Sequence, residues 1–215
     1  MRLVFLGPPG VGKGTHADIL AKDLKIKHYS TGDIFREILK ESSPLSEKLA
    51  RYVNSGELVP DEMVFETVQE ALSNCECENG WLLDGYPRSR KQAELLDNYL
   101  ERSGEELDWA VYLYAPDEVL IKRLTNRRVC RDCGAIYNLV NNLPKVDNIC
   151  DKCGGNLIQR EDDNIETIQR RISIFENEFR PLKEYYEDKG ILVKVLSEGN
   201  LENIANRLKE GLQIG

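Results

Sequence analysis

The sequence lacks several features that mark other classes of protein. No apolar run approaches the length of a membrane-spanning helix. The opening residues, MRLVFLGPPG, have an apolar part too short for a secretory signal peptide. There is no internal repeat and no low-complexity tail. We therefore expect a cytoplasmic protein that acts away from membranes.

The sequence also has fewer basic than acidic residues. The 215 residues include 29 Lys and Arg against 37 Asp and Glu, which gives a net charge of −8. This balance argues against broad, non-specific binding of nucleic acid. The hydrophobic content of 41% is that of a globular protein, and the length suffices for one domain with small insertions.

Short apolar segments alternate with amphipathic ones along the chain. Strand character is found at 2–6, 27–29, 81–84, 109–114 and 191–196, and helical spacing at 13–24, 31–41, 61–73, 88–102, 117–127, 164–188 and 201–212. This alternation predicts an α/β fold of three layers, with a central five-stranded parallel sheet covered on both faces by helices. Ligands of such sheets bind beyond the carboxyl ends of the strands.

The stretch GPPGVGKGT, residues 7–15, predicts a phosphate-binding loop between the first strand and the first helix. Backbone N–H groups and the helix dipole face a bound anion there, and Lys13 adds a point charge for the β- and γ-phosphates. Many P-loops have Ser or Thr directly after the lysine. Here Gly14 follows Lys13, and Thr15 comes one position later. This ending favours small nucleoside monophosphate kinases over switches and motors.

Two segments interrupt the alternation of strands and helices. Residues 30–59 contain the turns SSP and NSGELVP and are expected to form a flap of two short helices. Residues 128–159 are rich in Asn, Asp, Gly and Cys and leave no room for a long helix, so we interpret them as a second insertion.

Four cysteines of the second insertion have the spacing of a metal site. Two C-x2-C pairs are separated by sixteen residues, and a glycine follows each pair and permits its turn; the cysteines are Cys130, Cys133, Cys150 and Cys153. Four thiolates predict a structural, tetrahedral Zn²⁺ site with no open position, and iron in the same cage is the alternative. Cys75 and Cys77 have no partner pair and are expected to be free thiols.

Arginines recur at strand ends, at insertion hinges and on one expected helix face. They are Arg36, Arg88, Arg123, Arg127, Arg160 and Arg171. The spacing of Arg123 and Arg127 places both on one face of the helix expected over 117–127. Planar guanidinium groups bind phosphate oxygens in pairs, which predicts a clamp for a transferring phosphoryl group.

Taken together, these motifs resemble the adenylate kinases in their long bacterial form, which has a zinc-bearing lid. The matching stretches are GPPGVGKGT, STGDIFR, SGELVPDE, WLLDGYPRS with Gln92 after it, RLTNRR, the four-cysteine insertion, and REDD followed by QRRI. The resemblance implies the reaction Mg·ATP + AMP ⇌ 2 ADP in a monomer, with closure of both insertions, for which the adenylate kinase lid is a known example. It also implies a core of 1–29, 60–125 and 164–215, an NMP-binding insertion of 30–59 and a zinc-binding lid of 126–163.

The resemblance further assigns residues to the donor nucleotide. Lys13 lies at the transferring end of the ATP phosphates, and Asn200 reads the adenine through its backbone carbonyl. The ATP-binding positions are Gly10, Val11, Gly12, Lys13, Gly14, Thr15, Arg123, Arg127, Ile136, Tyr137 and Asn200. The catalytic positions are Lys13, Arg88, Arg123, Arg127, Arg160 and Arg171.

The acceptor positions are implied in the same way. They are Thr31, Arg36, Glu57, Leu58, Val59, Gly85, Tyr86, Pro87, Arg88, Gln92, Arg160 and Arg171. Asp33 and Asp84 match carboxylates that orient Mg²⁺ through water. Two positions depart from the family pattern, since His16 stands where Gln is common and Tyr86 where Phe is common.

Other functions remain as alternatives at this stage. One keeps the enzyme class and changes the acceptor to UMP, CMP or GMP. The other is a P-loop switch or motor whose zinc ribbon docks RNA or a partner protein. Against this second alternative, the sequence has no guanine-reading N-K-x-D motif, and WLLDG lacks the Asp-Glu pair of motor ATPases.

Overall fold

The computed structural model of the chain describes residues 1–39, 46–47, 50, 52, 59–75 and 77–214. They form two units. The first comprises Met1–Gly7, Gly12–Leu113 and Glu178–Gly215, and the second comprises Pro8–Val11 and Tyr114–Asn177.

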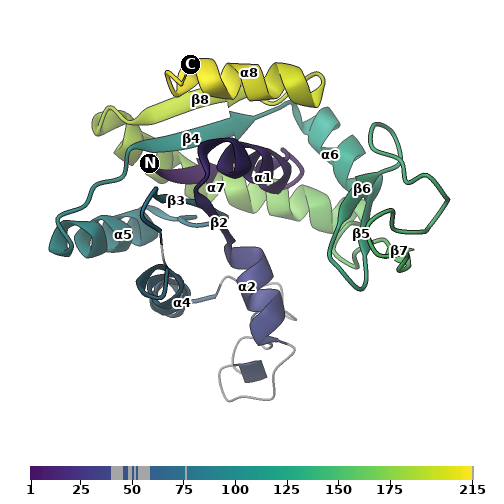
Figure 1. The fold of residues 1–215 in the computed structure, drawn as a ribbon, viewed down its shortest axis with the longest axis horizontal. Helices are drawn as coiled ribbons and strands as arrows, with labels where there is room; N and C mark the ends of the chain where they lie inside the picture. The colour runs from purple at the N-terminus through teal and green to yellow at the C-terminus, as the bar shows by residue number, and fades with distance from the viewer. Residues whose placement is uncertain (40–45, 48–49, 51, 53–58, 76, 215) are drawn as a thin grey trace. The chain divides into compact units, whose positions relative to one another are not determined.

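The first unit is built on a five-stranded sheet whose order is β2-β3-β1-β4-β8 (Figure 1). The strands are β1 (Arg2–Leu6), β2 (Lys27–Ser30), β3 (Trp81–Asp84), β4 (Trp109–Tyr114) and β8 (Leu192–Leu196). Strand β1 pairs in parallel with β3 and β4 on its two sides. Leu3 to Leu6 are at most 3% exposed. Because successive strand residues point to opposite faces, both faces of the sheet are covered, as predicted.

Several helices belong to the first unit. They are α1 (Lys13–Leu24), α2 (Thr31–Ile38), α4 (Asp61–Ser73), α5 (Arg90–Arg102), α8 (Leu201–Gly211) and the end of α7 (Ile165–Asp188). Helix α1 packs against β2, β3 and α8, and α4 packs against α5 (Figure 1). In the end of α7, Phe179 is buried with its ring centroid 4.2 Å from that of Tyr112 in β4.

Helix α5 begins at Arg90 and not at the expected residue 88. Ser89 has an extended backbone, and its side chain accepts a hydrogen bond from the Gln92 N–H, so it is the N-cap. A serine hydroxyl that satisfies a free N–H of the first turn fixes the start of a helix. This start matters for the site because it sets the position of Gln92.

The second unit contains α6 (Asp117–Thr125), the first part of α7 and a small antiparallel sheet of order β6-β5-β7. These strands are β5 (Arg127–Cys130), β6 (Ile136–Asn138) and β7 (Leu157–Ile158). The prediction that one helix continues to residue 127 is wrong, because α6 ends at Thr125 and Arg127 begins β5, paired with Asn138. Arg123 and Arg127 therefore do not share a helix face.

Half of the flap predicted over 30–59 lies outside the described residues, and α2 is its main described part. No helix among the described residues has the length and apolar character needed to cross a membrane.

Candidate functional site

The loop between β1 and α1 has the backbone of a phosphate cradle. Gly10 and Gly12 have positive φ angles of 82° and 95°, which glycine adopts without strain. A Cβ atom on Gly10 would lie 2.8 Å from Leu124 Cγ, so this position requires glycine for close approach as well. Helix α1 has no side-chain N-cap and no acidic residue in its first turn. Its N-terminal N–H groups and dipole are therefore suited to an anion.

Two cations contact this loop. Lys13 Nζ donates a hydrogen bond to the Gly7 carbonyl at 2.7 Å. Arg123 Nη1 donates to the Val11 carbonyl at 3.2 Å. The sequence predicted both residues as phosphate ligands, and these bonds hold the two side chains to the backbone of the loop itself.

Asp84 ends strand β3 next to the start of α1. The register pairs Asp84 with Phe5 of β1, and a Cβ atom on Gly14 would lie 3.3 Å from Asp84 Oδ2. A carboxylate is thus placed at the first turn of the helix that follows the phosphate loop. Oxygen ligands of this kind suit Mg²⁺, so Asp84 fits the magnesium role that the sequence predicted.

The turn after β3 gathers several predicted acceptor residues. Thr31 Oγ1 donates to the Asp84 carbonyl at 3.2 Å, and Arg88 Nε donates to the Gly85 carbonyl at 2.8 Å. Gly85 has a φ of 81°, and a Cβ atom there would lie 2.8 Å from Thr31 Oγ1. The peptide bond between Tyr86 and Pro87 is cis. Arg88 is exposed, whereas Tyr86 and Pro87 of the same turn are buried.

Tyr86 and Gln92 form the buried side of this turn. Tyr86 is fully buried, and its hydroxyl donates to the Gln92 carbonyl at 2.9 Å. Burial, with the charges of Asp61 and Asp97, raises the pKa of Tyr86, so the hydroxyl remains a donor. The departure from phenylalanine thus adds a hydrogen bond to α5. Gln92 is 5% exposed, and its amide contacts Asp61 and the Arg88 backbone.

The arginines of the second unit are held by two aspartates. Arg127 donates to both oxygens of Asp163, at 2.8 and 2.6 Å, and the Asp163 side chain is fully buried. Arg171 donates to Asp162 Oδ2 at 2.6 Å. Bonds of this paired geometry are those that guanidinium groups also make to phosphate oxygens. The aspartates were quoted in the REDD motif, yet no role was assigned to them from the sequence.

Arg160 lies in the same segment. It is half-buried, and its carbonyl accepts the N–H of Asp163 at 3.1 Å. The backbone thus fixes the spacing between Arg160 and the aspartate that holds Arg127.

The four predicted metal ligands come together in the second unit. Their Sγ atoms all lie within 4.8 Å of one another, with 3.4 Å between Cys130 and Cys153 and 3.5 Å between Cys133 and Cys150. Tetrahedral zinc with Zn–S bonds of about 2.3 Å places sulfurs roughly 3.8 Å apart, so the cluster fits this ion. No other group of three or more potential metal ligands is found in the described part of the chain.

Two matching turns build this cluster. In each, the N–H four residues after the first cysteine donates to that cysteine's carbonyl, at 3.0 Å for Gly134 and 2.9 Å for Gly154. Both glycines have positive φ angles, 72° and 76°. The prediction that glycines permit the two turns is confirmed.

Tyr137 supports the cluster from β6. Its hydroxyl lies 3.5 Å from Cys150 Sγ and accepts the Asp151 N–H at 2.7 Å. The hydrogen bond from Tyr137 lowers the pKa of the Cys150 thiol to about 6, which favours the thiolate that a metal binds. Ile136 is 45% exposed beside it. The sequence analysis assigned both residues to ATP and did not indicate the contact of Tyr137 with Cys150.

Asn200 is the N-cap of α8. Its side chain accepts the Asn203 N–H at 2.8 Å, and its carbonyl accepts the Ile204 N–H at 3.3 Å. This capping bond explains the asparagine independently of any nucleotide.

Several predicted acceptor residues fall outside what can be placed. Glu57 and Leu58 lie outside the described residues, and Val59 directly precedes Pro60, the N-cap of α4. Asp33 and Arg36 lie in α2, whose course follows directly from β2.

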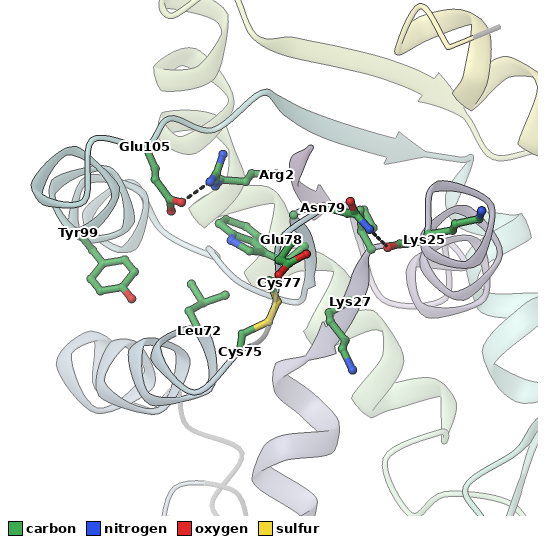
Figure 2. A pocket seen from close by; sticks show the side chains of 13 residues that line it. Arg2, Lys25, Lys27, Leu72, Cys75, Cys77, Glu78, Asn79, Tyr99 and Glu105 are labelled. Carbon is green, nitrogen blue, oxygen red and sulfur yellow. Dashed lines mark hydrogen bonds and ion pairs between the residues drawn. A yellow bond between two sulfur atoms is a disulfide. The ribbon is translucent and has the colours of Figure 1, made fainter.

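A hollow of about 830 Å³ lies elsewhere on the first unit (Figure 2). It is lined by Arg2, Lys27 and Trp81, which begin β1, β2 and β3, and by residues of nearby loops and of helices α4 and α5. It therefore belongs to the amino ends of the strands, whereas the phosphate loop and the Gly85–Arg88 turn follow the carboxyl ends. The predicted nucleotide site is not this hollow.

Cys75 and Cys77 line the hollow and are joined by a disulfide (Figure 2). The expectation of two free thiols is wrong. Their Cα atoms are 5.1 Å apart, within the range that a disulfide spans.

Comparison with known proteins agrees with these motifs. The family model described as adenylate kinase matches residues 5–191. The adenylate kinase of Carboxydothermus hydrogenoformans is 46% identical over 213 residues, covering 99% of this chain and 100% of the relative. That of Caldanaerobacter subterraneus is 46% identical, covering 99% and 96%, and that of Clostridium botulinum is 44% identical, covering 97% and 100%. The chain belongs to the adenylate kinase family.

Proposed function

We propose that the protein transfers the γ-phosphoryl group of Mg·ATP to AMP, in the reversible reaction Mg·ATP + AMP ⇌ 2 ADP. One observation carries the proposal. The phosphate loop follows β1 and the Gly85–Arg88 turn follows β3, and these strands pair directly, with Phe5 beside Asp84. Since neighbouring strands are only about 4.8 Å apart, two phosphate-binding turns begin at one edge of the sheet. Membership of the adenylate kinase family supports the same reaction.

The donor nucleotide is assigned to the phosphate loop. Gly10 to Thr15 offer backbone N–H groups to its phosphates, Lys13 serves the transferring end, and Arg123 binds from α6. Ile136, Tyr137 and the Asn200 carbonyl are assigned to the remainder of ATP. The contacts of Lys13 and Arg123 with the loop backbone support the first part of this assignment.

The acceptor is assigned to the turn after β3 and to its neighbours. AMP is held by Thr31, Arg36, Glu57, Leu58, Val59, Gly85, Tyr86, Pro87, Arg88 and Gln92. The AMP phosphate is already an anion and attacks in line, so no general base is needed. Catalysis then consists mainly of positioning and of charge stabilisation by cations.

Arg127, Arg160 and Arg171 are assigned to the phosphoryl group in transit. Two of them are paired with Asp163 and Asp162. A guanidinium held by a carboxylate is already oriented as a fork, and phosphate oxygens bind the same fork. The two aspartates therefore hold the arginine side chains in place between catalytic cycles, when no phosphate is bound.

Two metals complete the proposal. Asp84, with Asp33, is assigned to Mg²⁺ through water, and the bound ion neutralises charge on the β- and γ-phosphates. The four-cysteine cluster is assigned to structural Zn²⁺, which has all four positions filled by thiolates. Metal analysis of the purified protein distinguishes zinc from iron.

The domain partition belongs to the same proposal. We assign 1–29, 60–125 and 164–215 to the core, 30–59 to the NMP-binding insertion and 126–163 to the zinc-binding lid, both of which close during turnover. We further propose that the protein is a monomer of the cytoplasm. Gel filtration with light scattering tests the monomer.

A coupled assay that records ADP formation from ATP tests the function directly. It is run with AMP, UMP, CMP or GMP as the acceptor, and without any acceptor. We expect fast turnover with AMP and little with the other three. Preference for another monophosphate would reassign the acceptor, and ATP consumption that needs no monophosphate would refute the transfer reaction in favour of an ATPase.

A further inference from the structure

Both the nitrogen and the oxygen of the Gln92 side-chain amide are hydrogen-bonded. Gln92 Nε2 donates to Asp61 Oδ1 at 2.6 Å, and Gln92 Oε1 accepts the backbone N–H of Arg88 at 2.7 Å. Asp61 belongs to the first turn of α4 and Gln92 to the first turn of α5, two helices that pack together (Figure 1). The two bonds thus join two helices and the acceptor turn.

These partners fix which end of the amide carries oxygen. An ionised carboxylate only accepts hydrogen bonds, and a backbone N–H only donates them. If the amide rotated by half a turn, its oxygen would face the Asp61 carboxylate and its NH₂ would face the Arg88 N–H. Both contacts would then be repulsive, and both part-buried groups would lose a partner. The chemistry of the two neighbours therefore permits one orientation of Gln92.

Asp61 is itself held in place. Its second oxygen, Oδ2, accepts a hydrogen bond from Ser89 Oγ at 3.2 Å. The same Ser89 hydroxyl accepts the Gln92 N–H at 3.2 Å as the N-cap of α5. On the other side of the helix start, Tyr86 donates to the Gln92 carbonyl. The backbone and the side chain of Gln92 are thus fixed by separate bonds.

The two amide bonds leave one donor and one acceptor of Gln92 for a ligand. An amide has two N–H donors and two acceptor positions, and in the described part of the chain Asp61 uses one of the former and Arg88 one of the latter. The remaining N–H and the remaining acceptor position have a fixed order in space. A purine base bound at Gln92 would have to match this arrangement of one donor and one acceptor.

We propose that Asp61 is a positioning residue that sets the preference of the acceptor site between purine bases. Adenine offers an N6–H donor beside the N1 acceptor, and hypoxanthine offers the O6 acceptor beside an N1–H donor, the reverse order. An amide held in one orientation makes hydrogen bonds to one of these two base edges. Against the other edge it places donor facing donor and acceptor facing acceptor. This inference rests on the proposed function, which assigns Gln92 to the AMP site, and it adds that the Gln92 amide faces the base.

The substitution Asp61→Asn tests the inference with the smallest change of shape. Asparagine can turn either its oxygen or its NH₂ toward Gln92, so only the Arg88 N–H still favours one orientation of the amide. We expect the ratio of kcat/KM for AMP to that for inosine monophosphate to fall about tenfold, the worth of roughly one hydrogen bond. The change should fall on the KM of the acceptor, while the KM for ATP stays the same.

Glu62→Gln is the matched control. Glu62 is the next residue of the same helix turn, and it is exposed and pairs with Lys91. The control removes the same charge from the same helix N-terminus without touching Gln92, so any general effect on α4 appears in both variants. We expect the AMP preference of Glu62→Gln to equal that of the parent protein. Asp61→Ser, which withdraws the carboxylate altogether, is the second variant and should lower the preference as Asp61→Asn does.

The outcomes separate the two proposals. If the parent protein does not phosphorylate AMP, the proposed function fails. If it does, and Asp61→Asn or Asp61→Ser keeps the full preference for AMP over inosine monophosphate, the role of Asp61 is refuted while the function stands. A loss of preference of equal size in Glu62→Gln would also refute it, because the effect would then come from helix charge.

Discussion

Removal of the metal should loosen the four-cysteine insertion before the rest of the protein. Among the described residues, the buried cluster around the metal site includes two large apolar side chains besides the cysteines, Tyr137 and Leu157, and Val129 is buried next to Cys130. Seven others nearby are between 39 and 60% exposed: Ile136, Leu139, Val140, Leu143, Val146, Ile149 and Ile158. The insertion therefore has little apolar core of its own.

Metal binding contributes more to the stability of the four-cysteine insertion than apolar burial does. Burial of two large apolar side chains contributes about 5 kcal/mol. A structural zinc ion contributes on the order of 10–16 kcal/mol in small metal-dependent folds. Without metal, the insertion loses the larger of its two sources of stability, whereas the first unit keeps a sheet whose central strand is almost fully buried.

The assay compares protein with and without a chelator. We expect a lower melting temperature and faster proteolysis at residues 138–148 in the metal-free protein, with turnover largely retained at low temperature. Cys150→Ser should reproduce these effects, whereas Cys75→Ser, which breaks a disulfide outside the cluster, should not increase proteolysis at residues 138–148. If chelation abolished turnover while melting and proteolysis stayed unchanged, the metal would be catalytic and the reasoning would be refuted.

Three substitutions test the site. Arg88→Lys keeps the charge and loses the planar fork, so kcat should fall at least ~10²-fold in steady-state assays; a near-normal kcat would make Arg88 a surface residue. Gln92→Ala should raise the KM for AMP far more than the KM for ATP, and equal effects would contradict its assignment to the acceptor. Asp163→Asn weakens a buried ion pair with Arg127 and should lower the free energy of unfolding by roughly 3 kcal/mol in denaturant titrations. The control Asp162→Asn, at a half-exposed carboxylate, should cost less than about 1 kcal/mol, and equal losses would show that burial does not matter here.

The central sheet and the phosphate loop were predictable because their signals are local. The apolar run before GPPGVGKGT forms β1, and the glycines of that loop adopt the positive φ angles that their type permits. Regular cysteine spacing likewise predicted the cluster in the second unit, because each C-x2-C turn is closed by hydrogen bonds within a few residues.

The errors arose where distant residues decide the structure. Arg127 lies in β5 because that strand pairs with β6, and its guanidinium is oriented by Asp163, 36 residues along the chain. Helical spacing alone favoured a helix face shared with Arg123. The contact between Asp61 and Gln92 spans 31 residues, so no local pattern in the motif SGELVPDE indicates it.

The most direct test of the account supplies the protein with Mg·ADP alone and follows the phosphorus NMR spectrum. Two bound ADP molecules should exchange a phosphoryl group, so ATP and AMP should appear in equal amounts with no free phosphate. The yield should stop at an equilibrium mixture of the three nucleotides. Release of phosphate, or AMP without matching ATP, would contradict phosphoryl transfer between two bound nucleotides.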